Sequence, residues 1–313
     1  MFFDNVLIAG EQVVILYVIV AIGFIADKVG FFTEKVAKSC TDLLFYIVTS
    51  AKIVESFYSL EYTPETAKKL FIALACGLLL HLVSAGISTL VFNRCPIEKA
   101  CIFKYASAYG NCGYMALPLA SAVLGDEGVF YCSAVIISFQ MFTFTHGVYT
   151  INKGNPDSKV KFDWKKLILN PGVLSVMVGL PIFLLSIDLP DIITEPITYV
   201  ASLNSPLAML IFGTYIANTN FRTIFKEWRI LGVAAIKLLI LPAIMLCGLS
   251  LIGIKGALLV ALTISASAPP ATNTAIFAAK YGRDTGLASQ TVASVSFMSI
   301  LTMPVMIAAA QLI

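Results

Sequence analysis

Two short stretches of this 313-residue chain place helix-breaking residues and amide side chains inside apolar sequence. The first runs from Tyr109 to Pro118, reads Tyr-Gly-Asn-Cys-Gly-Tyr-Met-Ala-Leu-Pro, and lies midway along an apolar segment. Glycine, asparagine and proline so close together loosen or break a helix. Backbone amides freed in hydrocarbon are costly unless they are buried in protein or line a wet cavity. We therefore expect a solute site at this break.

The second stretch runs from Ser265 to Thr274 and reads Ser-Ala-Ser-Ala-Pro-Pro-Ala-Thr-Asn-Thr. Each break frees amide donors at the start of a half-helix, where the partial positive charge favours a carboxylate. Close helix packing is the alternative explanation for a single break, whereas two matched breaks favour a binding site. The candidate substrate-binding residues at the breaks are Asn111, Cys112, Gly113, Pro118, Pro269, Pro270, Thr272 and Asn273.

Polar side chains in other apolar segments are further candidates, because such residues are costly in a membrane and mark solute pathways. Gln140 is expected to face the site, with an interhelical hydrogen bond as the alternative. Lys52 and Glu55 share one helical face and are expected to pair, or Lys52 extends to the membrane surface. Lys237 lies about eight residues into its segment and can reach the surface in the same way.

A coupling ion is expected to be a proton or sodium, and uncoupled transport also stays open. Histidine can relay protons near neutral pH, although a hydrogen-bonded core histidine is commoner. Asparagine and threonine oxygens can coordinate sodium, so the candidates come from both halves of the chain. They are His81, Asn273, Thr274 and Gln290.

Composition identifies an integral membrane protein. Hydrophobic residues make up 58% of the chain and charged residues only 12%, against about 25% charged in soluble domains. A net charge of +3 gives no reason to expect a nucleic acid partner. The seven cysteines show neither a CxxC motif nor a pairing with histidines, so we expect no disulfide framework and no metal site. Neither HExxH nor GxSxG occurs, so we expect no catalytic residues and no enzyme, and a sensor role has no soluble domain to support it.

Ten apolar runs of about 20 residues, the length that crosses a bilayer as a helix, fill the chain. They predict an all-α polytopic membrane protein with no barrel-like alternation. The runs are approximately residues 6–26, 36–58, 68–92, 100–124, 128–151, 167–187, 195–218, 230–253, 256–280 and 286–311. No cleavable signal peptide is expected, since the first run has no basic leader and continues to Ala26.

Charge placement predicts the orientation of these ten spans. Sixteen of the 21 lysine and arginine residues fall in the loops of one side, and the other side holds Lys68, Lys69 and Lys255. The positive-inside rule places the first side in the cytoplasm and both termini outside the cell membrane. Residues 1–151 and 167–313 then form two five-span repeats of opposite direction, joined by a cytoplasmic linker at 152–166. A shift of 157 residues lays the first break over the second.

The two breaks also resemble those of a known family. Gly110 to Leu119, with Gly125 and Gly128 behind it, is similar to the fourth span of the auxin efflux carrier family in its bacterial branch. Pro269 to Thr274, with Ala279-Lys280-Tyr281-Gly282 and Asp284, is similar to the ninth span, and Ser296 to Pro304 resembles the last helix.

This resemblance implies the fold of bile acid–sodium symporters: ten spans, an inverted repeat, and crossed fourth and ninth helices. Four spans would form a scaffold and six a mobile transport domain that carries the substrate across the lipid bilayer by an elevator movement. The implied substrates are auxin-like carboxylates or dicarboxylates such as malate and malonate, with a sodium-coupled symporter-like carrier as the alternative. A scaffold of this kind is compatible with a homodimer. Family members often carry a proline in span two, where this chain has Ser50 and, two residues on, Lys52, which are added to the candidate substrate contacts.

Overall fold

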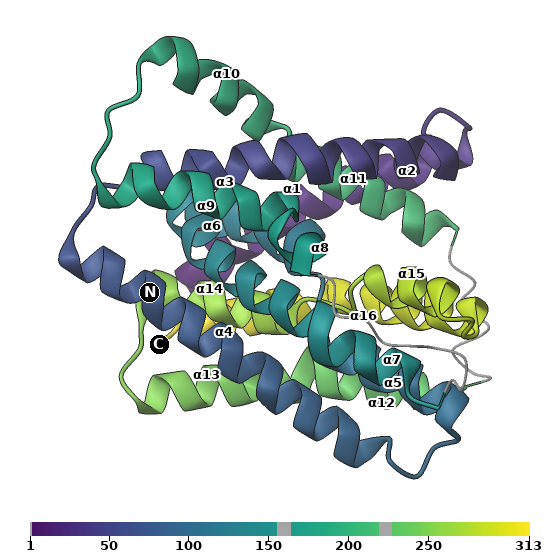
Figure 1. Cartoon of the computed structure of the whole chain (residues 1–313). Coiled ribbons are helices and arrows are strands. Elements are labelled where there is room, and N and C mark those ends of the chain that lie inside the picture. The colour runs from purple at the N-terminus through teal and green to yellow at the C-terminus, as the bar shows by residue number, and fades with distance from the viewer. Residues whose placement is uncertain (1, 155–163, 219–226) are drawn as a thin grey trace.

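Helices build the whole architecture of the computed structural model, which describes residues 2–154, 164–218 and 227–313 (Figure 1). The expected all-helical class is confirmed for these ranges, in which no strand occurs. Five helical segments are long and apolar enough to cross a membrane: Pro64–Val91, Cys112–Asn152, Asp191–Ala217, Arg229–Leu251 and Thr285–Gln311. Most of the predicted 152–166 linker lies outside the described residues.

Several apolar segments combine an α-helix with a π-helical stretch, labelled η. The N-terminal half contains α1 (Phe2–Lys28), α2 (Glu34–Leu43), η1 (Leu44–Val48), α3 (Thr49–Tyr58), α4 (Pro64–Val91), α5 (Ile97–Ala108), η2 (Cys112–Ala116), α6 (Leu117–Phe142), η3 (Thr143–Gly147) and α7 (Val148–Asn152). The C-terminal half contains α8 (Trp164–Ile168), α9 (Pro171–Leu184), α10 (Asp191–Ser202), α11 (Asn204–Ala217), α12 (Arg229–Ala234), η5 (Ala235–Ile240), α13 (Leu241–Leu251), α14 (Gly256–Ser267), α15 (Asn273–Lys280) and α16 (Thr285–Gln311).

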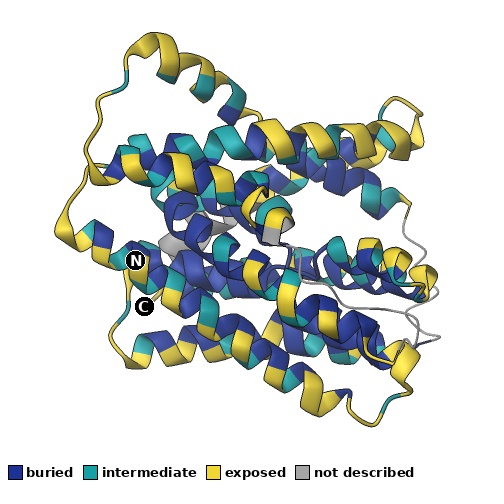
Figure 2. Cartoon of the chain, viewed as in Figure 1, coloured by how far each residue is buried: buried dark blue, intermediate teal, exposed yellow. Residues whose placement is uncertain are grey.

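The described helices pack as two bundles. In the peripheral bundle, α1 lies along α11, and α3 packs against α9 and α10. In the central bundle, α14 packs against α6, α13 and α16, while α4 covers α5 and α6. The bundles meet where α6 contacts α1, α3, α9 and α11, and where α1 contacts α16. Buried residues concentrate around α5, α6 and α14 inside the central bundle, whereas α10 is largely exposed (Figure 2).

Both broken segments end in a glycine with a left-handed backbone. Gly125, inside α6, has φ 63° and bends that helix, and Gly282, after α15, has φ 64°. Only glycine adopts this conformation without strain, which explains its presence at both bends. The two glycines are 157 residues apart, the same shift that lays the first break over the second in the sequence.

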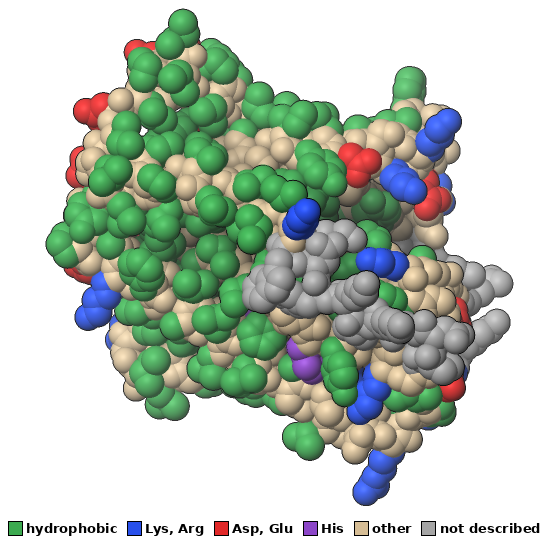
Figure 3. All heavy atoms as spheres, in the orientation of Figure 1, with side chains coloured by type: hydrophobic (Ala, Val, Ile, Leu, Met, Phe, Trp, Pro, Cys, Tyr) green, Lys and Arg blue, Asp and Glu red, His purple; other side chains and the backbone are tan. Residues whose placement is uncertain are grey.

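Charged side chains mark the two ends of the spans. On the face shown in Figure 3, basic side chains gather near the ends of α2, α5 and α7, and hydrophobic side chains cover most of the remaining surface. Glu227 joins α5 to α12 there, with Lys99 Nζ at 2.5 Å and Arg229 Nη1 at 3.0 Å. Burial alone raises the pKa of the Glu227 carboxyl, but these two hydrogen bonds outweigh it and lower that pKa. Lys104, which the charge count places in a loop, lies inside α5 and is 7% exposed.

The close approach of α1 and α11 depends on glycine. A Cβ on Gly213 would lie 2.6 Å from the backbone nitrogen of Phe24, so no side chain fits there. A Cβ on Gly23 would likewise meet the backbone of Leu210. Small residues that let helix backbones approach are the usual packing device in membranes.

We expect Gly213→Ala to destabilise the protein by about 1–3 kcal/mol, because overpacking pushes α1 away from α11. Thermal unfolding in detergent measures this. Gly248→Ala is the matched control, since Gly248 is also helical but has open space around its Cβ position; its melting temperature should stay level or rise. Equal melting temperatures for the two variants would contradict the packing explanation.

Candidate functional site

The two helix breaks are joined to each other through their backbones. Asn111 N–H donates to Pro269 O at 2.7 Å, and Ala271 N–H donates to Tyr109 O at 2.9 Å. These bonds form an isolated antiparallel bridge between Gly110 and Pro270. Polar backbone groups that the breaks free are thereby satisfied inside the apolar interior. The structure thus brings together two stretches that lie about 160 residues apart in the sequence.

Asn111 begins the helix that follows the first break. Its Oδ1 accepts a hydrogen bond from Tyr114 N–H at 3.1 Å, which caps η2. The other amide groups of a first helical turn have no intrahelical partner. After the second break α15 begins at Asn273, and its N-cap residue Thr272 makes no side-chain capping bond. Two helix starts, each with a partial positive charge, therefore lie at one place in the fold.

A cavity of about 610 Å³ opens beside the paired breaks. It lies between the two bundles, with walls from η1, η2, α6, α9 and α15. The polar and charged residues that line it are Asp42, Thr49, Asn111, Gln140, Lys165, Asn170, Thr272 and Asn273. Its aromatic walls come from Phe45, Tyr46, Tyr114, Phe139 and Phe144. Such a mixture suits a small molecule with a polar head and an apolar body.

The structure places only some of the predicted substrate-binding residues on this cavity. Five of them line it: Asn111, Gly113, Gln140, Thr272 and Asn273. Gln140 is 4% exposed, and its Oε1 has no hydrogen-bond partner among the described residues. Pro269 and Pro270 form the bridge behind the cavity, and Cys112 is buried away from it. Pro118 turns its carbonyl toward the peripheral bundle, where Ser205 Oγ donates to it at 3.0 Å.

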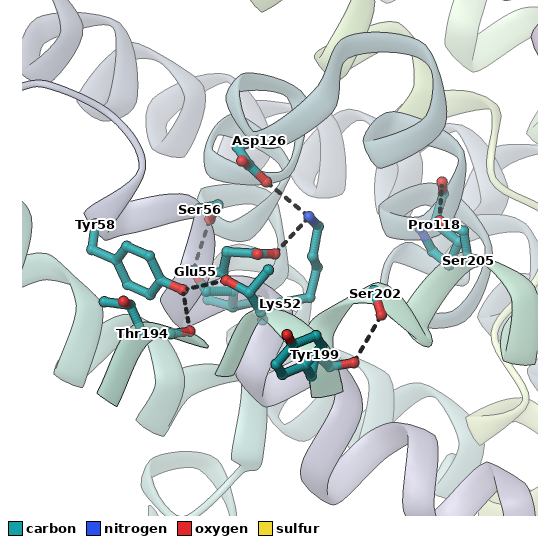
Figure 4. Close-up of polar contacts among 12 residues, drawn as sticks. Lys52, Glu55, Ser56, Tyr58, Pro118, Asp126, Thr194, Tyr199, Ser202 and Ser205 are labelled. Atoms are coloured by element: carbon teal, nitrogen blue, oxygen red, sulfur yellow. Dashed lines mark hydrogen bonds and ion pairs between the residues drawn. The ribbon is translucent and has the colours of Figure 1, made fainter. Parts of the chain in front are cut away.

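Lys52 makes a contact between the two bundles and does not line the cavity (Figure 4). Its Nζ lies 2.7 Å from Glu55 Oε2 on its own helix, which confirms the expected local pair. It also lies 2.8 Å from Asp126 Oδ1, directly after the bend at Gly125. Two carboxylates thus surround the ammonium group that was predicted to face the substrate. Ser50, half-buried on α3, does not line the cavity either.

The predicted coupling-ion residues are dispersed. His81 is 2% exposed, donates from Nδ1–H to Gly77 O at 2.7 Å, and stacks on Tyr109. Thr274 is fully buried behind the second break, and its Oγ1 has no partner within the described ranges. Gln290 is half-buried near the start of α16, away from the cavity. Of these candidates only Asn273 lines the cavity.

The sequence did not decide the role of Lys237, and the structure places its side chain at the breaks. It lies in η5 and is 1% exposed, so its side chain does not reach the membrane surface. A Cβ on Gly110 would lie 2.7 Å from Lys237 Cε and from Nζ. The signal in the sequence was the charge itself, because a lysine within a span is a functional candidate by default.

Comparison with known proteins gives a consistent result. The sequence profile of a family described as membrane transport protein matches residues 8–307. An uncharacterized transporter of Methanocaldococcus jannaschii is 25% identical over 302 residues, which cover 93% of this chain and 95% of that protein. A protein of Rhizobium meliloti, provisionally named a malonate transporter, is 26% identical over 68% of each chain. Auxin efflux carrier component 1 of Arabidopsis thaliana is 29% identical over 38% of this chain and 20% of its own length.

Proposed function

Because the chain belongs to the membrane transport protein family, the family of the auxin efflux carriers, we propose that it is a secondary active transporter of small organic carboxylates. Membership confirms the resemblance of the two motifs. The substrate class follows from the site: two helix starts favour an anion, and aromatic walls accept its carbon skeleton. Malonate and malate come first as candidates, since one relative is provisionally named for malonate, and indole carboxylates come second.

The paired breaks are the observation that carries this proposal. Irregular backbone deep in a membrane protein is costly, and here it is kept at one place, beside a cavity of about 610 Å³. Interrupted helices in corresponding positions of two halves are typical of the binding sites of secondary transporters. A purely structural role for both breaks leaves the cavity and its amide side chains unexplained.

The transmembrane arrangement that we infer has ten spans and an inverted repeat. Each half contains a twelve-residue helix, α5 or α14, that ends at a break, and each broken segment ends at a left-handed glycine. The fourth and ninth spans would cross at the Gly110–Pro270 bridge. With the basic loops in the cytoplasm, both termini lie outside the cell membrane.

Transport by this fold would use movement of the central bundle against the peripheral bundle. The cavity lies between the bundles, at the end where Asp42 and Lys165 are exposed. Toward the other end, Lys52–Asp126 and Ser205–Pro118 connect the bundles. The conformation is therefore one in which the site opens to the basic, cytoplasmic side while these contacts close the outer side. An elevator cycle has to break them.

Uptake by the purified protein in liposomes tests the proposed function. Labelled malonate, malate and indole-3-acetate should be tried separately, with and without sodium and with and without a pH gradient. We expect saturable uptake of at least one of them. A requirement for sodium would favour the alternative of a symporter-like coupled carrier. No flux of any carboxylate would overturn the proposal.

We expect Asp126→Asn to raise the turnover number about fivefold and to leave KM within about twofold, because the lost ion pair contributes about 1 kcal/mol to the closed state. Glu55 still pairs with Lys52 in this variant, so no buried charge is left alone. Glu127→Gln is the matched control, since Glu127 accepts a hydrogen bond from Tyr131 of its own helix. If both variants turn over at the same rate, the contact does not limit the cycle.

A further inference from the structure

The Lys237 side chain brings a buried positive charge against the paired breaks. Its Cε and Nζ occupy the space that a side chain at position 110 would need, each 2.7 Å from an ideal Cβ there. Glycine at 110 therefore does more than loosen a helix, since it admits the ammonium group to the bridge. Lys237 lies in the π-helical stretch η5, and such stretches are common at functional sites.

No acidic residue of the surrounding helices is placed to neutralise this charge. The elements packed against η5 are α5, α12, α13, α14 and α16. Within their bounds only α5 contains an acidic residue, Glu98, in its first turn and far from the break. Lys237 Nζ makes no hydrogen bond or ion pair with any residue in the described ranges. The titratable side chains beside it are Cys112 and His81, and neither is a carboxylate.

The described part of the cavity wall offers an anion little positive charge. Asp42 and Lys165 are the acidic and basic residues on its walls, and both are exposed. The deep wall, at Asn111, Gln140 and Asn273, carries neutral amides. A carboxylate bound at this deep wall lacks a charged partner among the described lining residues. The buried cation Lys237 lies against the bridge but does not line the cavity.

We propose that Lys237 is the fixed positive charge that balances the substrate carboxylate across the Gly110–Pro270 bridge. This inference rests on the proposed function and assigns the charge balance of the same site. A buried ammonium group without an acidic partner is costly. A carboxylate bound in the cavity lowers this cost by electrostatic attraction across the bridge, without direct contact with the ammonium group. Lys237 and the substrate would cross the membrane together as the central bundle moves. Their charges cancel, so movement of the substrate-bound bundle transfers no net charge from this pair and needs no sodium to balance the carboxylate. Lys237 is thus a positioning residue for the anion.

The test combines ligand-induced thermal stabilisation with uptake kinetics for wild type, Lys237→Met and Lys237→Arg. Lys104→Met removes the same charge from neighbouring α5 and serves as the control. For Lys237→Met we expect a ligand-free melting temperature equal to or above that of the wild type, loss of the shift caused by malonate, and KM raised at least about tenfold. Lys237→Arg should keep part of the malonate shift. Wild-type uptake should be unchanged when choline replaces sodium.

The outcomes separate this inference from the proposed function. If the wild type transports a carboxylate and Lys237→Met keeps its KM and its thermal shift, the inference is overturned and the function stands. A sodium requirement in the wild type overturns it as well. If no carboxylate raises the melting temperature of the wild type and the wild type transports none, both the inference and the proposed function are overturned. Should Lys237→Met fail to fold, Lys237→Gln gives the same reading, because it removes the charge and keeps a polar end.

Discussion

Asn111→Asp is expected to abolish carboxylate uptake while the protein stays folded. The aspartate keeps an oxygen that can accept from Tyr114 N–H, so the cap of η2 is preserved. The backbone bond from residue 111 to Pro269 is also unaffected by the side chain. What changes is the charge, because a carboxylate now lines the cavity beside the bound anion. Like charges a few ångströms apart in a protein interior repel by several kcal/mol, which corresponds to a loss of more than about a hundredfold in affinity.

Asn111→Ala and Asn170→Ala complete this experiment. Alanine at 111 loses both the cap and the amide donor, so stability falls by about 1 kcal/mol together with uptake. Asn170 lines the same cavity but caps α9 of the peripheral bundle. Its alanine variant should lose similar stability and much less uptake than Asn111→Asp. If Asn111→Asp transports as well as the wild type, Asn111 is a cap and not a substrate contact.

Gly110→Ala is expected to lower both the melting temperature and the transport rate. The new methyl group would lie 2.7 Å from Lys237 Nζ and 3.0 Å from Ala268 O, inside ordinary contact distance. Since Lys237 is fully buried, neither its ammonium group nor the backbone of the second break can yield without cost. We expect about 1–3 kcal/mol of destabilisation and at least about tenfold slower uptake, because the bridge is displaced.

Gly113→Ala is the control for this prediction. Gly113 belongs to the same break, but nothing lies within 4 Å of its Cβ position. Its melting temperature should therefore remain close to that of the wild type, as measured by thermal unfolding in detergent. Equal stability of Gly110→Ala and Gly113→Ala would show that the bridge tolerates a side chain at 110. The close packing of Lys237 against the break would then not matter for folding.

The sequence predicted the parts of this site that depend on local chemistry. Asn111 and Asn273 follow helix breakers, and such breaks can be recognised within ten residues, so the cavity wall that they form was expected. Gln140 was expected there as a lone amide in an apolar span. The all-helical fold follows from apolar runs alone.

Contacts between distant segments could not be predicted in the same way. Lys237 meets Gly110 across 127 residues, and nothing near either position indicates the other. From the sequence, Asp126 is expected to lie in a turn. Its ion pair with Lys52 depends on the bend of α6 at Gly125, which local sequence does not indicate. The aromatic walls were missed because the chain has 21 phenylalanines and 12 tyrosines, which look alike in apolar spans whether they face lipid, core or cavity.

The central claim is that a carboxylate binds at the paired breaks, and equilibrium binding tests it most directly. Labelled malonate, malate and indole-3-acetate would be titrated against the purified wild type and Asn111→Asp in detergent, with melting temperatures measured on the same samples. We predict one saturable site per chain in the wild type and none in Asn111→Asp at equal stability. Equal affinity in the two proteins, or no binding of any of the three by the wild type, would contradict the account.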